Sequence, residues 1–178
     1  MVKLFKNRII YVLPLFCSIC AHADFTAHLS RVIDGDTLDV VKTQSGSLKA
    51  AQETVRIRLT GIDAPESKQA YGQDAKRRLS ALVTNRSLRV KEDAKDRYGR
   101  TLAFVTACKV RYKKGTENCT PVNYTLVSEG LAWAYRYHNR PSDRIAARLE
   151  TSAKGSRLGL WASNSPVEPW KWRRIHRN

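Results

Sequence analysis

Apolar and polar residues alternate with period two in five short stretches of the chain. This alternation predicts strands at residues 27–32, 38–41, 55–59, 88–91 and 102–110. In the third stretch the apolar side chains point to one face, so Arg58 on the opposite face is free of the core. Five short strands favour a small barrel.

The period becomes helical after Tyr71-Gly72, where an apolar stripe runs through a basic segment: Ala75, Leu79, Leu82 and Val83. We expect this helix to cover the barrel. A second, shorter helix is expected from Val122 to Glu129. Pro121 is tolerated in its first turn, and Gly130 suits its C-terminal cap.

A third helix is expected to begin near Ser142 as its N-cap. Its inward face would carry Ile145, Leu149 and Ala153. After Trp161, prolines and polar residues argue against a regular helix.

The first 23 residues differ from the rest, because three basic residues precede an apolar run at 9–20 and small residues occupy positions 21 and 23. This arrangement is typical of a signal peptide. An uncleaved membrane anchor is the alternative, but a run of about 12 residues is short of the roughly 20 that a membrane-spanning helix needs. We therefore predict a cleaved signal peptide at 1–23 and one domain at 24–178, whose basic tail with Trp and Pro begins at about residue 162.

Net charge narrows the class of partner. The whole chain carries +16, and removing three basic residues and no acidic one with the signal peptide leaves +13. Such a charge favours polyanions, because each neutralised phosphate releases bound counterions. Solubility or attraction to an anionic membrane surface would produce a similar composition. Trp170 and Trp172 of the tail more often cap the edge of a core than stack on a base.

Cys108 and Cys119 remain as a pair once Cys17 and Cys20 leave with the signal peptide. Export would let them form a disulfide across a hairpin, with a turn at residues 113–116. A zinc site is disfavoured, because two cysteines with no nearby histidine fall short of four ligands. We expect a structural disulfide.

Three short segments at strand edges carry the candidate chemistry: Asp34-Gly35-Asp36-Thr37, the segment from Arg58 to Glu66, and Asp96-Arg97-Tyr98-Gly99-Arg100. Aspartate carboxylates suit a hard, oxygen-seeking cation such as Ca²⁺. The planar arginine fork matches two phosphate oxygens, and a glutamate can deprotonate or orient water. Together these groups could hydrolyse a phosphodiester. Taken singly, each is more often a solvated turn or a surface charge.

In this order, and together with Gly130-Leu131-Ala132, the segments resemble the signatures of the staphylococcal nuclease family over roughly residues 26–162. The resemblance implies an α+β fold, mainly β, in which a five-stranded OB-type barrel carries three helices. It also implies Ca²⁺-dependent hydrolysis of DNA and RNA. The family breaks the bond between phosphorus and the 5′ oxygen and leaves 3′-phosphate ends.

The resemblance also assigns a metal site. Asp36 and Asp63 correspond to carboxylate ligands, and Ala64 corresponds to a ligand through its backbone carbonyl. Asp34 resembles an acid that supports the ion indirectly.

The same resemblance implies the catalytic residues. Glu66 corresponds to the carboxylate that activates or positions water. Arg58 and Arg100 correspond to the guanidinium groups that bind the phosphate and stabilise the transition state. Three tyrosines resemble residues of the nucleotide pocket, although packing is an equally good interpretation of them: Tyr98, Tyr135 and Tyr137.

Two rival functions stay open. A catalytically silent OB-fold barrel would bind nucleic acid without cutting it. Such modules can lose the carboxylates, whereas Asp36, Asp63 and Glu66 are all present here. A cationic protein attracted to membrane or wall polyanions is supported only by net charge and the basic tail. We expect an exported monomer, periplasmic or extracellular, that takes DNA and RNA as substrates, with no obligate protein partner and no stable membrane insertion.

Overall fold

The computed structural model describes residues 24–43, 53–111 and 116–176. The predicted signal peptide at 1–23 lies outside the described residues. Within the described ranges, no helix is both long enough and apolar enough to cross a membrane.

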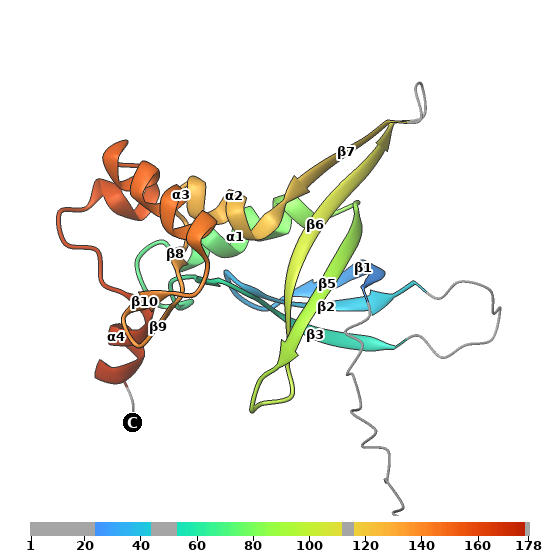
Figure 1. Ribbon diagram of the computed structural model, residues 1–178, viewed down its shortest axis with the longest axis horizontal. Helices are drawn as coiled ribbons and strands as arrows, with labels where there is room; N and C mark the ends of the chain where they lie inside the picture. The colour runs from blue at the N-terminus through green and yellow to red at the C-terminus, as the bar shows by residue number, and fades with distance from the viewer. Residues whose placement is uncertain (1–23, 44–52, 112–115, 177–178) are drawn as a thin grey trace, which may run out of the picture.

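Five strands close into a barrel: β1 (Phe25–Val32), β2 (Thr37–Lys42), β3 (Thr54–Leu59), β5 (Ser87–Lys95) and β6 (Thr101–Arg111). They are hydrogen-bonded in the order β3-β2-β1-β5-β6, and a parallel pairing of β3 with β6 closes the ring (Figure 1). The apolar faces meet inside, where Leu38, Ile57 and Leu88 are fully buried. The predicted α+β fold with a five-stranded OB-type barrel is confirmed.

A further strand, β7 (Thr116–Pro121), extends the sheet beyond the barrel by pairing with β6. Cys108 lies opposite Cys119 in this hairpin, and their sulfurs form the predicted disulfide. The sequence pattern does not reveal β7, because its polar residues show no apolar alternation.

Three helices pack on one side of the barrel: α1 (Gly72–Val83), α2 (Val122–Ser128) and α3 (Arg144–Gly155). The apolar stripe predicted for α1 is buried. After α2, Gly130 has a φ of 70°, the left-handed conformation in which a glycine often ends a helix. The first two predicted helices are therefore confirmed.

Short elements connect the helices to the barrel. They are the pair β4 (Ile62–Asp63) with β8 (Trp133–Ala134), the pair β9 (Arg136–Tyr137) with β10 (Arg140–Pro141), and the 3₁₀ helix η1 (Gly159–Ala162). The first pair matters most for the site, because it fixes the backbone of Asp63 against the segment that follows α2.

The predicted start of α3 is wrong by one residue, and its predicted inward face is only partly confirmed. Its N-cap is Asp143 rather than Ser142, because the Asp143 carboxylate accepts the N–H groups of Ile145 and Ala146. Ile145 is 52% exposed, whereas Ala146 and the charged Glu150 are buried. An apolar pattern could not place this face, because one of its inward residues is an acid.

Glu150 is stabilised in the interior by two basic side chains. It accepts hydrogen bonds from Arg136 at 3.2 and 2.5 Å, and Lys154 lies 3.4 Å from it. Of the residues predicted to point inward, Ala153 is buried and Leu149 is half-buried. The pair with Arg136 attaches α3 to β9, whereas the pair with Lys154 lies within α3.

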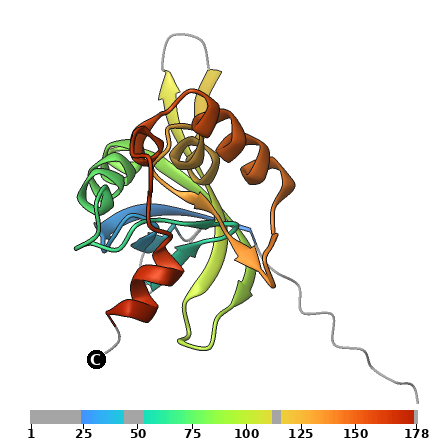
Figure 2. The same cartoon turned by 90° about the vertical axis from the view of Figure 1, so that its left-hand side faces the viewer.

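The tail forms a fourth helix, α4 (Pro169–Ile175), where none was predicted. Pro169 lies in its first turn, where a missing N–H breaks no helical hydrogen bond. Trp170 packs edge-on against Trp133, with ring centroids 5.7 Å apart, and so caps a core edge as predicted. Figures 1 and 2 show that α4 stands apart from the other three helices.

Asn123 ties α2 to the barrel. Its side chain is fully buried, and its Oδ1 accepts the Val105 N–H at 3.0 Å. Its Nδ2 donates to the carbonyls of Thr60 at 2.9 Å and Ala103 at 3.2 Å. Because Thr60 belongs to the turn between β3 and β4, this amide fixes the chain that leads to Asp63.

Candidate active site

Two buried aspartates lie at the rim of the barrel. Asp36 directly precedes β2 and Asp63 ends β4, and they are 5% and 1% exposed. The Asp36 Oδ2 accepts the Ala64 N–H at 2.7 Å, which joins the two segments. Gly35 permits this approach, because a Cβ there would lie only 2.7 Å from the Ala64 Cβ.

Two neighbours orient the Asp36 loop. The Asp34 Oδ1 accepts the Asp36 N–H at 3.0 Å, and the Thr37 hydroxyl donates to the Asp36 Oδ1 at 3.2 Å. Asp34 therefore contacts the backbone of Asp36 rather than its carboxylate.

Asp36 sits where negative charge is poorly stabilised. Burial, with the nearby carboxylates of Asp34 and Asp63, raises the pKa of Asp36 to about 7, although the charge of Arg58 lowers it. A bound cation would stabilise the charged form of this buried carboxylate.

Arg58 lies between the two aspartates. Its Nη2 donates to the Asp63 Oδ1 at 2.7 Å, and its Nε lies 3.0 Å from the Asp36 Oδ1. Its Nη1 donates to the carbonyls of Leu59 and Ile62, each at 2.9 Å. The strand alternation correctly turned this side chain away from the core, and the structure places it among the acids.

Glu66 is held by the turn before α1. Its N–H donates to the Gln69 Oε1 at 3.1 Å, and its carbonyl accepts the Gln69 N–H at 2.8 Å. Gly72 packs directly on this turn, because a Cβ there would lie 1.9 Å from the Glu66 carbonyl oxygen. The Glu66 carboxylate is half-buried at the edge of the cleft.

Arg100 is positioned by the turn between β5 and β6. The Asp96 carboxylate accepts the N–H groups of Tyr98 at 2.9 Å and Arg100 at 3.0 Å, and also the Arg100 Nε at 2.7 Å. Within the described part of the chain, the Arg100 Nη groups make no hydrogen bond. Their donors are available to an anion.

Arg173 of α4 joins the acids, and the sequence did not single it out. Its Nη2 donates to the Asp63 Oδ2 at 2.8 Å, and its Nη1 donates to the Glu66 Oε1 at 2.7 Å and the Asp63 Oδ1 at 3.2 Å. Partial burial lowers the pKa of Arg173, but bonds to Asp63 and Glu66 outweigh that and raise it. The sequence shows only a basic end, because composition cannot tell which arginine reaches acids more than 100 positions earlier.

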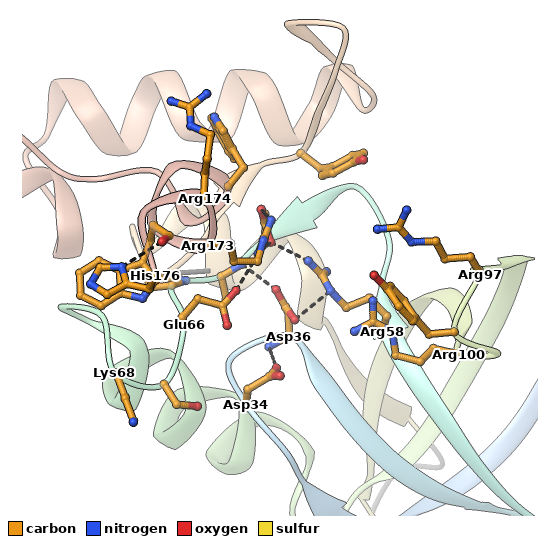
Figure 3. Close-up of a pocket in the computed structure, with 18 residues that line it drawn as sticks. Asp34, Asp36, Arg58, Glu66, Lys68, Arg97, Arg100, Arg173, Arg174 and His176 are labelled. Carbon is orange, nitrogen blue, oxygen red and sulfur yellow. Dashed lines mark hydrogen bonds and ion pairs between the residues drawn. The ribbon is translucent and has the colours of Figure 1, made fainter. Parts of the chain in front are cut away.

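The predicted metal ligands and catalytic residues line one cleft of about 1060 Å³ together with Asp34 and Arg173. In Figure 3 the acids lie at its centre, with Arg97 and Arg100 on one side and Lys68 and His176 on the other. A polyanion that crosses the acids would therefore meet positive charge in both directions.

Two of the three predicted tyrosines lie at the cleft, and one does not. Tyr98 and Tyr135 line the cleft, and both are exposed. Tyr137 packs edge-on against His138 and is not among the lining residues. Trp172 does line the cleft, where its ring stacks on His176 with centroids 3.9 Å apart.

The donor set fits a hard cation. Asp36, Asp63 and Glu66 supply carboxylate oxygens, and the Arg173 guanidinium already occupies a cation's position between two of them. Among the described residues, only one trio of metal-ligating side chains has its ligand atoms within 4.8 Å of one another: Cys108, Glu117 and Cys119. Its two sulfurs are joined in the disulfide, which leaves them unfit to bind a metal. The three acids of the cleft lie farther apart than that, with guanidinium groups between them.

Comparisons with known proteins identify the family of the chain. Residues 56–163 match the family model described as staphylococcal nuclease homologue. The chain is 43% identical over 164 residues to the micrococcal nuclease of Shigella flexneri, covering 92% of this chain and 89% of that protein. It is 38% identical over 157 residues to an uncharacterized endonuclease of Haemophilus influenzae, covering 88% and 78%.

A plant relative shares the same region. The staphylococcal-like nuclease CAN1 of Arabidopsis thaliana is 37% identical over 122 residues, which cover 68% of this chain and 34% of that protein. With the barrel and the group of acids and arginines, these matches show that the chain is a nuclease and belongs to the staphylococcal nuclease family.

Proposed function

We propose that this protein is a Ca²⁺-dependent phosphodiesterase that cuts DNA and RNA and leaves 3′-phosphate ends. One observation carries the proposal: Asp36 and Asp63 lie buried around Arg58, with Glu66 beside them. Carboxylates in a cleft that accepts phosphates repel the substrate unless a cation lies between. A barrel that only bound nucleic acid would gain nothing from them.

The metal would be held by the carboxylates of Asp36 and Asp63 and the carbonyl oxygen of Ala64. When bound, it supplies positive charge that stabilises the developing negative charge on the phosphate oxygens. The protein contributes the fixed geometry, because both carboxylates belong to backbone that the barrel holds.

Glu66 orients the attacking water or takes its proton. The water oxygen then bonds to phosphorus while the bond to the 5′ oxygen breaks. The leaving 5′ oxygen gains a proton, and the phosphate stays on the 3′ side.

Arg58 and Arg100 stabilise the charge that builds up during this displacement. A guanidinium offers two parallel donors to two phosphate oxygens, which an ammonium group cannot do. The Nη donors of Arg100, which bond to no other residue in the described part of the chain, suit the phosphate and the leaving oxygen.

The cleft favours flexible strands. Its acids lie between two basic flanks, so a single strand that bends to the site brings neighbouring phosphates to both flanks. Tyr98 and Tyr135 present exposed rings on which bases can stack. We expect single-stranded DNA and RNA to be cut faster than duplexes.

The proposal includes export as a monomer. Residues 1–23 have the layout of a signal peptide, and the Cys108–Cys119 disulfide suits an oxidising compartment. Mass spectrometry of protein recovered from outside the cytoplasm should find a chain that begins at Asp24. A chain that still carries residues 1–23 would contradict cleavage.

Digestion of DNA and RNA tests the chemistry. Purified protein should cut both with Ca²⁺, stop on addition of EDTA, and leave 3′-phosphate ends. Activity with another divalent ion but not with Ca²⁺ would overturn the choice of metal. Absence of cutting with every divalent ion would favour the silent barrel.

The Glu66→Gln variant tests the role of the acid. It should still bind DNA but cut about 10²- to 10⁴-fold more slowly, because the amide cannot take a proton from water. Glu53→Gln is the matched control, since Glu53 pairs with Lys42 on the surface away from the cleft. An unchanged rate in Glu66→Gln would remove Glu66 from the mechanism.

A further inference from the structure

The Arg173 guanidinium lies where a metal ion would have to bind. It spans Asp63 and Glu66 with three hydrogen bonds of 2.7 to 3.2 Å (Figure 3). Both carboxylates belong to the proposed machinery, one as a metal ligand and the other as the group that acts on water. A side chain from the far end of the sequence therefore covers the two acids that the reaction needs free.

Two cations bonded to the same pair of carboxylates repel each other. The Asp63 Oδ1 already accepts a hydrogen bond from Arg58, which leaves Oδ2 as the more accessible ligand atom. Among the described residues, the Asp63 Oδ2 is bonded only to Arg173. Metal ligands lie about 2.3–2.6 Å from Ca²⁺, so an ion on that oxygen would lie close to the guanidinium bonded to it at 2.8 Å, and the repulsion between the two positive charges favours the release of Arg173.

Arg173 can leave without disturbing the barrel. Its side chain is 45% exposed, and its helix α4 has only seven residues. The helix is attached mainly by the Trp170 contact with Trp133, and the segment before it by the hydrogen bond from Gln69 to the Val167 carbonyl. Rotation about the bonds of one long side chain is enough to clear the acids.

The displaced guanidinium stays beside the substrate path. Arg173 shares the cleft lining with Arg174, His176 and Lys68, so its charge remains next to any strand that lies there. Phosphate offers a guanidinium the same paired oxygens that the two carboxylates offer. A strand in the cleft therefore competes with the acids for Arg173.

We infer that Arg173 is an exchangeable residue of the active site, bonded to Asp63 and Glu66 in the metal-free enzyme and to a substrate phosphate when metal is bound. The inference rests on the proposed metal-dependent nuclease function. The exchange makes the metal and the nucleic acid bind cooperatively. The metal takes the carboxylates away from Arg173 and the phosphate takes Arg173 away from the carboxylates, so each ligand raises the affinity for the other by the same factor. Without substrate, Arg173 lowers the affinity for the metal.

Calorimetric titration with Ca²⁺ alone tests whether Arg173 lowers the affinity for the metal in the absence of substrate. Arg173→Met removes the competing charge but keeps much of the side-chain length, and it should bind Ca²⁺ about tenfold more tightly than the wild type. Arg174→Met is the charge-matched control, because Arg174 lines the cleft but makes no hydrogen bond to the acids among the described residues. Its affinity should rise by less than about twofold, the size expected from a screened charge. Equal shifts in both variants would overturn the exchange.

Nitrogen NMR of the arginine side chains tests the exchange directly in the wild type. The Arg173 side-chain resonances, assigned by their loss in Arg173→Lys, should move on addition of Ca²⁺ and move again when a short single-stranded DNA with a 3′-phosphate is added. The Arg31 resonances, from an arginine paired with Asp39 away from the cleft, should stay in place. An Arg173 signal unmoved by Ca²⁺ would overturn the inference.

Failure of this inference can be told from failure of the proposed function. If the protein cuts DNA only with Ca²⁺ but the Arg173→Met affinity equals that of the wild type, only the exchange is wrong. If the wild type neither binds Ca²⁺ nor cuts with it, the proposed function fails as well.

Discussion

The two walls of the cleft are built differently. The barrel wall consists of Asp36, Arg58 and Asp63, which are at the ends of strands whose other residues form the core. The tail wall consists of the α4 residues Trp172, Arg173, Arg174 and His176. Barrel-wall side chains are at most 13% exposed, whereas Arg173 is 45% exposed.

The difference separates two tasks. Groups that must stay in place are supported by core packing and by hydrogen bonds to the backbone, as Arg58 and Asp36 are. Groups that must yield to a ligand are held by contacts that water can replace. Catalytic geometry is best placed on rigid elements, and regulation on weakly attached ones.

The largest effect should come from loosening the barrel wall at Arg58. Arg58→Lys should lower kcat about 10²- to 10³-fold, because a lysine cannot bridge Asp36 and Asp63 and also offer a fork to phosphate. Arg56→Lys is the control, since Arg56 lies on the same face of β3 but pairs with Asp39 outside the cleft. Steady-state digestion of single-stranded DNA measures kcat for both variants. Equal decreases in kcat would show that the reaction does not need a guanidinium at position 58.

A smaller effect should follow from removing the hydrogen bonds between α2 and the barrel. Asn123→Ala should lower the free energy of unfolding by about 2–4 kcal/mol, because the buried Val105 N–H loses the side-chain partner that it has here and the carbonyls of Thr60 and Ala103 each lose one hydrogen bond. Asn118→Ala, at an exposed position of β7, should change it by less than about 0.5 kcal/mol. Urea unfolding measures the two. If the free energy of unfolding of Asn123→Ala equals that of the wild type, the Asn123 side chain contributes little to the stability of the barrel wall.

The smallest effect concerns an ion pair of the barrel that does no chemistry. Hydrogen bonds from Arg56, with help from Arg31, lower the pKa of Asp39 to about 2, although burial opposes them. Because this folded pKa lies below the ordinary 3.8, the charge stabilises the fold above pH 3.8, and this contribution is lost as the pH falls through about 2. Asp39→Asn should therefore lower the free energy of unfolding at pH 7 by about 1–2 kcal/mol, a value reduced by the exposure of both arginines.

The pH dependence supplies the check on Asp39. The difference between Asp39→Asn and wild type should shrink as the pH falls from 4 to 2, as followed by thermal unfolding. Asp74→Asn is the control, because Asp74 pairs with Arg77 on the exposed face of α1. A constant difference across that range would contradict the lowered pKa.

Much of the barrel wall could be predicted from the sequence, and the tail wall could not. Strand alternation fixes which way Arg58 points, and the order of the acidic motifs marks Asp36, Asp63 and Glu66. These signals are local, because they depend on residues a few positions apart. They also carry the fold, since the barrel strands bury a continuous apolar face.

The features that escaped prediction depend on polar residues placed by distant contacts. Glu150 is buried because Arg136 pairs with it, and the apolar pattern of α3 did not indicate that an acid lies on the inward face. In the sequence Asn123 looks like an ordinary helix residue, although its side chain bonds to the strand β6 and to the turn after β3. Pro169 opens α4 rather than preventing it, and only that helix brings Arg173 to the acids.

The parallel pairing of β3 with β6 has a consequence for the order in which the molecule is made. The ribosome delivers every acid of the cleft before it delivers β6, the strand that holds β3 in the ring. A nascent chain that ends before Thr101 therefore has these carboxylates but no closed barrel to present them, because the pairing of β3 with β6 cannot form earlier. On the proposed function, a growing chain therefore becomes able to cut RNA only after β6 has been made.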